Sequence, residues 1–368
     1  MAKDNSFLKA FQKDLEKIEG VGTSSQPPRY WFSFGNYVLN KIMSGSFTKG
    51  VPQGRVTSLA GSSGAGKSFL AANLVKAAQD EGAIILIVDS ENALDDDFMS
   101  KIGVDVETDE YMYASVTTVP QVTKVVSSFI KGYRGDWGTA EDAPPVLILI
   151  DSLDMLMTET EQEHYGKGVQ KGDQGQRNKQ LKAMLRTFVQ DVKEINVTLV
   201  FTSQVYKNQD VTNGEGLWIV SDAVKYSASQ IVLLSKLKLK DKAGGANETI
   251  GIRMKCEGYK TRFAKPFQAV TVEVPYETGM DPLSGLLEAS MGLGVVVQKG
   301  SWYRMSDSDE LWRAAAIADH KDEILTKCDA LGAEARLIVD DSVVVDNSDF
   351  EAESPASRRK TKAASTEE

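Results

Sequence analysis

The sequence predicts an α/β protein built on a mainly parallel central β-sheet with helices on both faces. From Trp31 onward, short apolar runs typical of buried strands alternate with segments long enough for crossover helices, which is the pattern of parallel βαβ units. The strand-like runs are Val56–Ala60, Ala83–Val88, Tyr111–Ser115, Val146–Ile150 and Val197–Thr202. The clearest helices are Leu70–Gln79, Val119–Phe129 and Gln180–Glu194. After Gln204, shorter strands with tight turns at 244–245 and 275–279 predict an antiparallel extension of the sheet.

The segment Leu59–Leu70, LAGSSGAGKSFL, connects the first of these strands to the first of these helices. It contains the phosphate-loop pattern G-x-x-x-x-G-K-[ST], in which glycines let main-chain N–H groups surround a polyphosphate at the start of a helix. Lys67 is expected to reach the β and γ phosphates, and the Ser68 hydroxyl to bind magnesium. The expected nucleotide contacts are Gly61, Ser62, Ser63, Gly64, Ala65, Gly66, Lys67, Ser68 and Phe69. The alternative is a glycine-rich turn without a ligand.

Polar residues follow three of the predicted strands, at the edge of the sheet where ligands of open α/β folds bind. Asp151 ends the run LILID and is expected to hold magnesium together with Ser68. Glu91 follows a second strand and is a candidate for orienting the attacking water, although an acid at a helix N-terminus would look the same. Gln204 follows a third strand and is a candidate sensor of the γ phosphate, with a solvated loop residue as the alternative.

The transition state of phosphoryl transfer is commonly stabilised by an arginine, and no obvious candidate lies near the phosphate loop in sequence. A cation from another chain is one candidate for this role. The segment KCEGYKTRFAK is a possible donor, with a solvated basic face as the alternative; its cations are Lys255, Lys260, Arg262 and Lys265.

Two polar loops combine cations with aromatic rings, which are the ingredients of a groove for single-stranded nucleic acid. Loop 1, Thr158–Lys179, has Lys167, Lys171, Arg177 and Lys179. Loop 2, Val205–Val220, has Tyr206, Lys207 and Trp218. Ordinary surface loops without a DNA contact are the alternative.

The 368-residue chain carries a formal net charge of −10. This argues against indiscriminate coating of nucleic acid but leaves a local basic groove open, because screening confines surface fields to about 10 Å. Two cysteines, Cys256 and Cys328, and two histidines, His164 and His320, provide neither a disulfide framework nor zinc-ligand spacing. No apolar run approaches a membrane span, and MAKDNSFLKAF lacks a signal-peptide core, so we expect a cytosolic protein.

We expect four regions along the chain. Residues 1–30 form a helix with the apolar stripe Phe7, Phe11, Leu15 and Ile18, followed by a linker; the helix either docks on a neighbouring subunit or folds back on its own domain. Residues 31–300 form the core, and 301–339 a small helical or mixed appendage. Residues 340–368 combine acids with Arg358, Arg359 and Lys360 and predict a disordered tail.

The order of GSSGAGKS, IVDSENALD, LILIDS, LVFTSQ and AVKYSAS resembles the RecA-type strand-exchange recombinases, over about Phe34–Tyr303. DPLSGLLE and the following LGVVV look most like the T4-type phage recombinases. The resemblance implies a RecA-like P-loop ATPase core. It also implies that Glu91 is the catalytic glutamate, that Asp95 and Phe98 contact adenine, and that Gln204 links ATP to DNA.

The same resemblance places Lys225 and Tyr226 at a subunit interface. Lys260 and Arg262 would reach across that interface to the neighbour's ATP, with arginine at the second position where the family has lysine. Loops 1 and 2 would bind DNA. Loop 2 lacks the family's Gly-Gly pair before AVKYSAS, and the C-terminal region is shorter than in the bacterial enzyme, so a DNA-gateway role is not carried over.

The implied function is a DNA-dependent ATPase that uses ATP and Mg²⁺. It would form a helical homo-oligomeric filament on single-stranded DNA and pair it with homologous duplex DNA, in a bacterium or a phage-infected cell. Single-strand-binding and loader proteins are candidate partners. The alternatives are a RecA-fold hexameric helicase and a nucleotide-binding recombination mediator without catalysis; the presence of both Glu91 and Gln204 counts against the mediator.

Overall fold

The computed structural model describes residues 6–18, 27–169, 175–193, 195–207, 218–240 and 249–332. Its centre is an eight-stranded sheet in the order β12-β11-β10-β3-β7-β6-β4-β5. The strands from β10 to β5 run parallel, and β11 and β12 continue the sheet antiparallel. The strands are β3 (Val56–Gly61), β4 (Ile84–Asp89), β5 (Tyr111–Ser115), β6 (Val146–Asp151), β7 (Val197–Ser203), β10 (Gln230–Lys240), β11 (Thr249–Lys260) and β12 (Ala269–Pro275).

The fold confirms the prediction of a mainly parallel sheet with an antiparallel extension. The expected strand-like runs all lie in the sheet, because unbroken apolar sequences suit strands that are buried on both faces. The turn at 275–279 is present, with Gly279 N–H bonded to Pro275 O. The turn expected at 244–245 lies outside the described residues.

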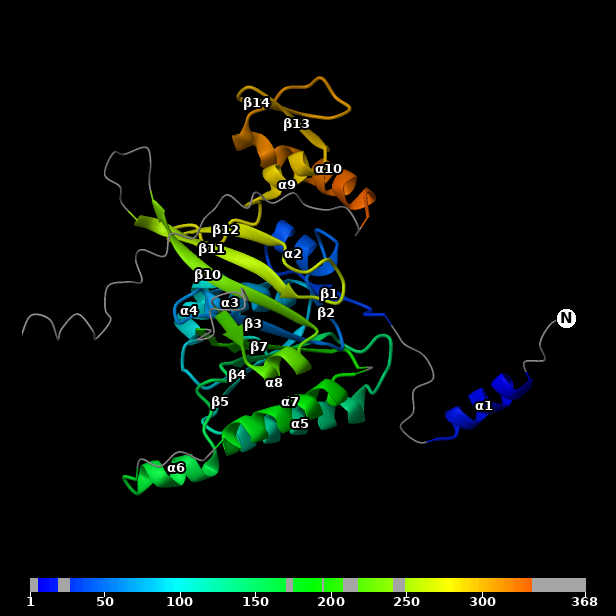
Figure 1. Ribbon diagram of the computed structural model, residues 1–368, viewed down its shortest axis with the longest axis vertical. Coiled ribbons are helices and arrows are strands. Elements are labelled where there is room, and N and C mark those ends of the chain that lie inside the picture. Colours follow the sequence, from blue (N-terminus) through cyan, green and yellow to red (C-terminus); the bar gives the residue numbers. More distant parts are fainter. Residues whose placement is uncertain are drawn as a thin grey trace, which may run out of the picture.

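Helices cover both faces of the sheet (Figure 1). One face packs against α2 (Tyr37–Ser44), α3 (Lys67–Asp80) and α4 (Asp96–Ile102) in a core that includes Leu59, Ile87 and Leu149. The other face packs against α5 (Val119–Asp136), α7 (Gln176–Asp191) and α8 (Asp222–Ser227) in a core that includes Ala60, Val88 and Ile150. Alternate residues of one strand therefore enter opposite cores.

Shorter elements complete the body. Strand β1 (Trp31–Phe32) pairs with β2 (Val51–Pro52), and β8 (Val205–Lys207) pairs with β9 (Trp218–Val220). Helix α6 (Glu159–Gly166) lies within loop 1. The C-terminal part contains α9 (Leu286–Gly292), β13 (Val296–Lys299), β14 (Trp302–Met305), the 3₁₀ turn η2 (Ala314–Ala316) and α10 (Ile317–Ala330). The boundary expected at residue 300 falls between the paired strands β13 and β14. The tail 340–368 lies outside the described residues.

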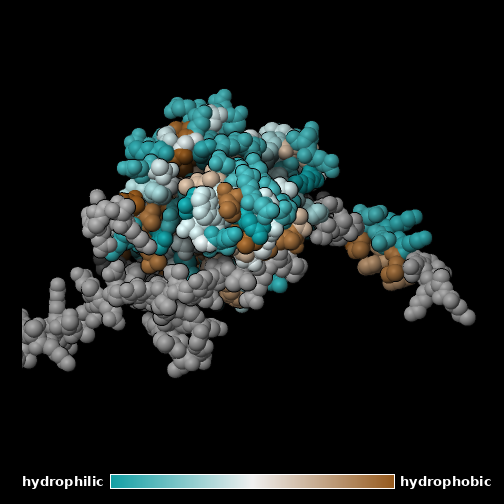
Figure 2. All heavy atoms as spheres, turned by 90° about the horizontal axis from the view of Figure 1, so that it is seen from above, coloured by the Kyte–Doolittle hydropathy of each residue, from teal (hydrophilic) through white to brown (hydrophobic). Residues whose placement is uncertain are grey.

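Helix α1 (Ser6–Glu16) stands apart from the body (Figure 1). Its apolar side chains are exposed, with 72% of Phe7 and 52% of Phe11 accessible. Figure 2 shows hydrophobic residues on one side of this helix and hydrophilic residues on the other. Among the residues that the structure describes, the apolar face of α1 is therefore largely exposed. None of the described helices combines the length and apolar character needed to cross a bilayer.

Candidate functional site

The phosphate loop connects the end of β3 to the start of α3. Gly66 is the N-cap of α3 with a φ of 96°, a left-handed conformation that favours glycine. Lys67 is the first helical residue, and its Nζ donates to the main-chain oxygens of Gly61 at 3.1 Å and Ser62 at 3.0 Å. Burial lowers the pKa of Lys67, while the carboxylates of Glu91, Asp151 and Asp154 favour its charged form.

Strands β10 and β11 pack directly against this loop, and they make small residues necessary in it. A Cβ on Gly61 would lie 2.7 Å from Leu234 O, and a Cβ on Gly66 would overlap Met254 Sδ. At Gly64, where φ is +68°, a Cβ would lie 2.8 Å from Lys236 Nζ. The Lys236 ammonium is the flexible end of a side chain and can move away, so Gly64 serves turn geometry, whereas Gly61 and Gly66 serve close packing as well.

Asp151 ends β6 and is 1% exposed. Its Oδ1 accepts a hydrogen bond from Thr202 Oγ1, and among the residues that the structure describes no donor contacts Oδ2. Burial raises the pKa of Asp151, and the hydroxyls of Thr202 and Ser68 oppose this shift. An unpaired carboxylate oxygen near a serine hydroxyl suits a hard divalent cation, so Asp151 and Ser68 fit the expected magnesium site.

Asp89 ends β4 and holds the segment that carries Glu91. The Asp89 carboxylate accepts the N–H groups of Glu91 at 2.8 Å, Asn92 at 2.8 Å and Leu94 at 3.1 Å. Glu91 is exposed, and its Oε1 accepts a hydrogen bond from Ser152 Oγ, next to Asp151. The structure therefore brings Glu91 beside the end of β6, with its carboxylate accessible to solvent.

Asp95 and Phe98 lie at the start of α4. Asp95 is the N-cap, and its Oδ1 accepts the N–H of Phe98 at 2.8 Å, while Asp96 and Asp97 occupy the first turn. The helix-terminus position, named above as the alternative for Glu91, is therefore occupied by Asp95, Asp96 and Asp97. Phe98 is half-buried against the core of α3, so its ring is held in place.

Asp154 was missed by sequence reasoning, which stopped at the acid three residues earlier. Its Oδ2 accepts the main-chain N–H of Gln204 at 2.6 Å, and its Oδ1 accepts the Tyr206 hydroxyl at 3.0 Å. Its carboxylate also favours the charged form of Lys67. Asp154 thus connects the phosphate loop with β8, where loop 2 begins. The second acid of LILIDSLD, three residues after Asp151, was the sequence signal that could have identified it.

The expected DNA-binding residues differ in their surroundings. Arg177 donates to the main-chain oxygens of Leu156 at 2.6 Å and Leu153 at 3.0 Å, so it ties the start of α7 to the segment after β6. Lys167 and Lys179 are exposed, and Tyr206 is 51% exposed. On the hairpin at the base of loop 2, Lys207 is paired with Trp218. Lys171 lies outside the described residues.

Lys260 and Arg262 lie at the end of β11, and the structure gives Lys260 partners within its own chain. Its Nζ donates to the main-chain oxygens of Lys225 and, at 2.7 Å, Ala228, which are the last carbonyls of α8. Burial lowers the pKa of Lys260, and the nearby Arg262 charge acts in the same direction. Arg262 is exposed, and so is 74% of Tyr226 on α8.

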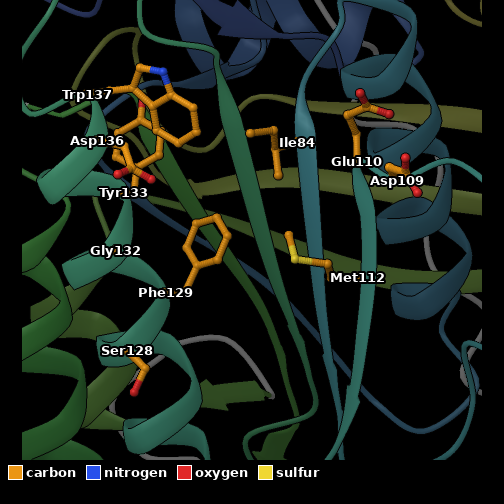
Figure 3. A pocket seen from close by; sticks show the side chains of 10 residues that line it. All are labelled: Ile84, Asp109, Glu110, Met112, Ser128, Phe129, Gly132, Tyr133, Asp136 and Trp137. Atoms are coloured by element: carbon orange, nitrogen blue, oxygen red, sulfur yellow. The ribbon is translucent and has the colours of Figure 1, made fainter.

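A cavity of about 350 Å³ lies at the edge of the sheet, between β4, β5 and α5. Figure 3 shows Phe129 and Tyr133 of α5, together with Trp137 just after its end, opposite Ile84 and Met112. Its remaining lining residues include the acids Asp109, Glu110 and Asp136. The lining therefore combines apolar and aromatic side chains with three carboxylates.

The fold and this site define a P-loop nucleotide-binding protein of the α/β class. Comparison with known proteins identifies its family: residues 9–281 match the RecA N-terminal domain, and the chain belongs to that family. Protein RecA of Aquifex aeolicus is 30% identical over 313 residues, which cover 83% of this chain and 81% of that protein. Protein RecA of Thermus aquaticus is 28% identical over 263 residues, covering 69% and 70%. Protein RecA of Desulforapulum autotrophicum is 28% identical over 284 residues, covering 74% and 72%.

Proposed function

We propose that this protein is a DNA-dependent ATPase of the RecA type that forms filaments on single-stranded DNA and pairs them with homologous duplex DNA. The observation that supports this most directly is the contact of Asp154 with Gln204 and Tyr206, beside the phosphate loop. Membership of the RecA family supports the same function. The features of DPLSGLLE and LGVVV favour a T4-type phage recombinase (UvsX type) within that family.

The nucleotide chemistry is assigned to one protomer. Lys67 and the loop N–H groups bind the phosphates of ATP, Ser68 and Asp151 hold Mg²⁺, and Glu91 orients the water that attacks the γ phosphate. Magnesium supplies charge neutralisation on the β and γ phosphates. Asp95 and Phe98 are assigned to adenine, with Phe98 half-buried and therefore oriented before the base arrives.

DNA contact is assigned to loops 1 and 2, through Lys167, Lys171, Lys179, Tyr206, Lys207 and Trp218. Arg177 acts as an anchor of loop 1 through its main-chain contacts. A γ phosphate at Gln204 shifts the segment that Asp154 holds, and this orders loop 2 around the strand. Hydrolysis reverses the shift and releases the DNA.

Neighbouring protomers complete the site. Lys260 and Arg262 of one protomer reach the ATP of the next, which requires Lys260 to leave the carbonyls of α8. Helix α1 docks in the cavity between β4, β5 and α5 of the neighbour. Its Phe7 and Phe11 suit the apolar and aromatic lining of the cavity, and Lys9 and Lys13, one helical turn apart, suit the carboxylates of that lining.

The decisive experiment is electron microscopy with ATP, Mg²⁺ and single-stranded DNA, followed by ATPase and strand-pairing assays. Helical filaments, DNA-stimulated turnover and joint molecules with a homologous duplex are expected. Closed rings that unwind duplex directionally would instead identify the helicase, and filaments without turnover the mediator. The matched variants are Lys67→Ala, expected to abolish turnover, and Asp154→Asn, expected to keep nucleotide binding while losing DNA stimulation. Protein that stays monomeric and ignores oligonucleotides in saturating nucleotide contradicts the proposal.

A further inference from the structure

Strand β10 brings a lysine that is distant in sequence into contact with the phosphate loop. Strand β10 runs parallel to β3, with Leu234 paired to Gly61, the last residue of β3. Side chains two residues apart on a strand share a face, so Lys236 lies on the same face as Leu234, at the level where the chain leaves β3 as the phosphate loop. Its ammonium reaches Gly64, where a Cβ would lie 2.8 Å from Nζ and 3.8 Å from Cε.

The neighbouring strand β11 confirms that Lys236 lies on the face of the sheet next to the phosphate loop. Lys236 pairs with Met254 on β11, and Met254 Sδ packs against Gly66 at the other end of the loop. Cross-strand partners lie on the same face of a sheet. Lys236 and Met254 therefore face the phosphate loop together. Met254 supports the loop with an apolar side chain, and Lys236 adds a cation.

The charges of the site favour a second cation at this position. Three carboxylates, those of Glu91, Asp151 and Asp154, act on Lys67. Lys260 donates to carbonyls of its own α8. Across the described part of the chain, Lys236 has no ion pair or hydrogen bond, and its side chain is exposed. A triphosphate adds further negative charge at close range, which an unpaired ammonium stabilises.

We propose that Lys236 is a second phosphate-binding lysine, supplied by the same protomer that carries the phosphate loop. This rests on the proposed function, because it requires a nucleoside triphosphate on that loop. The Lys236 ammonium contacts phosphate oxygens from the side of Gly64, while Lys67 contacts them from the start of α3. The residue acts on binding before any neighbour arrives, unlike Lys260 and Arg262.

Lys238 provides a matched control. It lies two residues further along β10, is exposed like Lys236 and is expected on the same face. No atom of Lys238 lies within 4 Å of the Cβ position at Gly64. A general effect of positive charge on nucleotide affinity would appear in both variants, whereas a direct contact appears only in Lys236→Ala.

The test is equilibrium binding of a fluorescent non-hydrolysable ATP analogue with Mg²⁺ to full-length protein without DNA. Lys236→Ala is expected to weaken binding about tenfold, which is typical of a lost hydrogen bond to a charged group. Lys236→Arg restores most of the affinity and Lys238→Ala keeps it. Affinity for AMP stays unchanged in all variants. Thermal unfolding verifies that each variant is folded.

The two hypotheses fail differently. If the unaltered protein does not bind the analogue, the proposed function is wrong and Lys236 loses its role with it. If the unaltered protein binds and Lys236→Ala binds equally well, or if Lys238→Ala is weakened to the same extent, the assignment of Lys236 is wrong while the proposed function stands.

Discussion

Lys260 Nζ donates a hydrogen bond to the main-chain oxygen of Ala228, 2.7 Å away. The same ammonium donates to Lys225 O, so one lysine at the end of β11 caps the C-terminus of α8. Cations at this end of a helix are favourable, because the last carbonyls lack partners within the helix. A residue expected to reach a neighbour's ATP is thus held by its own chain in the single protomer.

Lys260→Ala is therefore expected to spare nucleotide binding by a single protomer and to lose DNA-stimulated ATP turnover in filaments. Lys255→Ala, on the same strand, is the control and keeps turnover. The measurement is ATPase rate with and without single-stranded DNA, next to analogue binding at low protein concentration. Normal hydrolysis by Lys260→Ala filaments would show that the assignment across the interface is wrong.

Asp151→Asn is expected to lose Mg²⁺-dependent nucleotide binding without losing stability in the absence of metal. Burial raises the pKa of Asp151 in the folded state above its value in the unfolded state. The free energy of unfolding therefore falls as the pH rises from the unfolded pKa to the folded pKa, and stays lower above it. The asparagine removes this pH dependence. Thermal unfolding in EDTA between pH 4 and pH 8 measures the difference, expressed as the melting temperature of the variant minus that of the unaltered protein. A difference in melting temperature that stays constant from pH 4 to pH 8 would contradict a raised pKa of Asp151.

Gly66→Ala is expected to destabilise the protein by more than Gly82→Ala. Both glycines have positive φ, so both substitutions carry a backbone cost of about 1 kcal/mol. Only Gly66 has a close neighbour, Met254 Sδ, whereas nothing lies within 4 Å of a Cβ at Gly82. Overpacking at Gly66 adds about 1–3 kcal/mol in urea denaturation. The double variant Gly66→Ala/Met254→Ala recovers part of this if the sulfur is the obstacle; equal losses at both glycines would exclude a packing role.

Phe11→Asp is expected to prevent filament assembly while leaving the monomer folded, because Phe11 is 52% exposed and contributes little to the core of its own chain. Gln12→Asp adds the same charge at the next position of α1 and serves as the control. Trp137→Ala tests the receiving cavity from the other side. Sedimentation with ATP and single-stranded DNA distinguishes the variants. Filaments formed equally by Phe11→Asp and Gln12→Asp would remove α1 from the interface.

The protein is expected to lose stability as the pH rises from about 10 through 12, in part through Tyr133. Burial raises the pKa of Tyr133 to about 12, and its hydroxyl donates to Pro144 O at 2.9 Å. The unfolded tyrosine ionises near pH 10, so above that pH the unfolded state releases a proton that the folded state retains. Tyr133→Phe should flatten this decline in urea denaturation across pH 9–11.5. An unchanged slope would assign the alkaline loss to other groups.

The strands and the phosphate loop were predictable because their signals are local. The run LILID forms β6 wherever both faces of a sheet are covered, and GSSGAGKS needs only the strand before it and the helix after it. Helix boundaries were less exact: α3 starts at Lys67 rather than Leu70, because the first helical turn belongs to the loop motif. The pattern after Gln204 correctly predicted antiparallel strands. It did not predict which of these strands packs against the phosphate loop.

The sequence by itself determined the class of protein, which is a nucleotide-binding α/β core. It also placed Lys67 and Ser68 in the phosphate-loop motif, and Asp151 and Glu91 at or just after the ends of strands. The tertiary structure decided which distant residues meet those groups. Lys236 reaches Gly64, Met254 packs on Gly66, and Asp154 holds Gln204, all through the order of strands in the sheet. Local patterns set the period of a segment, but only the packing of strands brings residues far apart in sequence within contact distance.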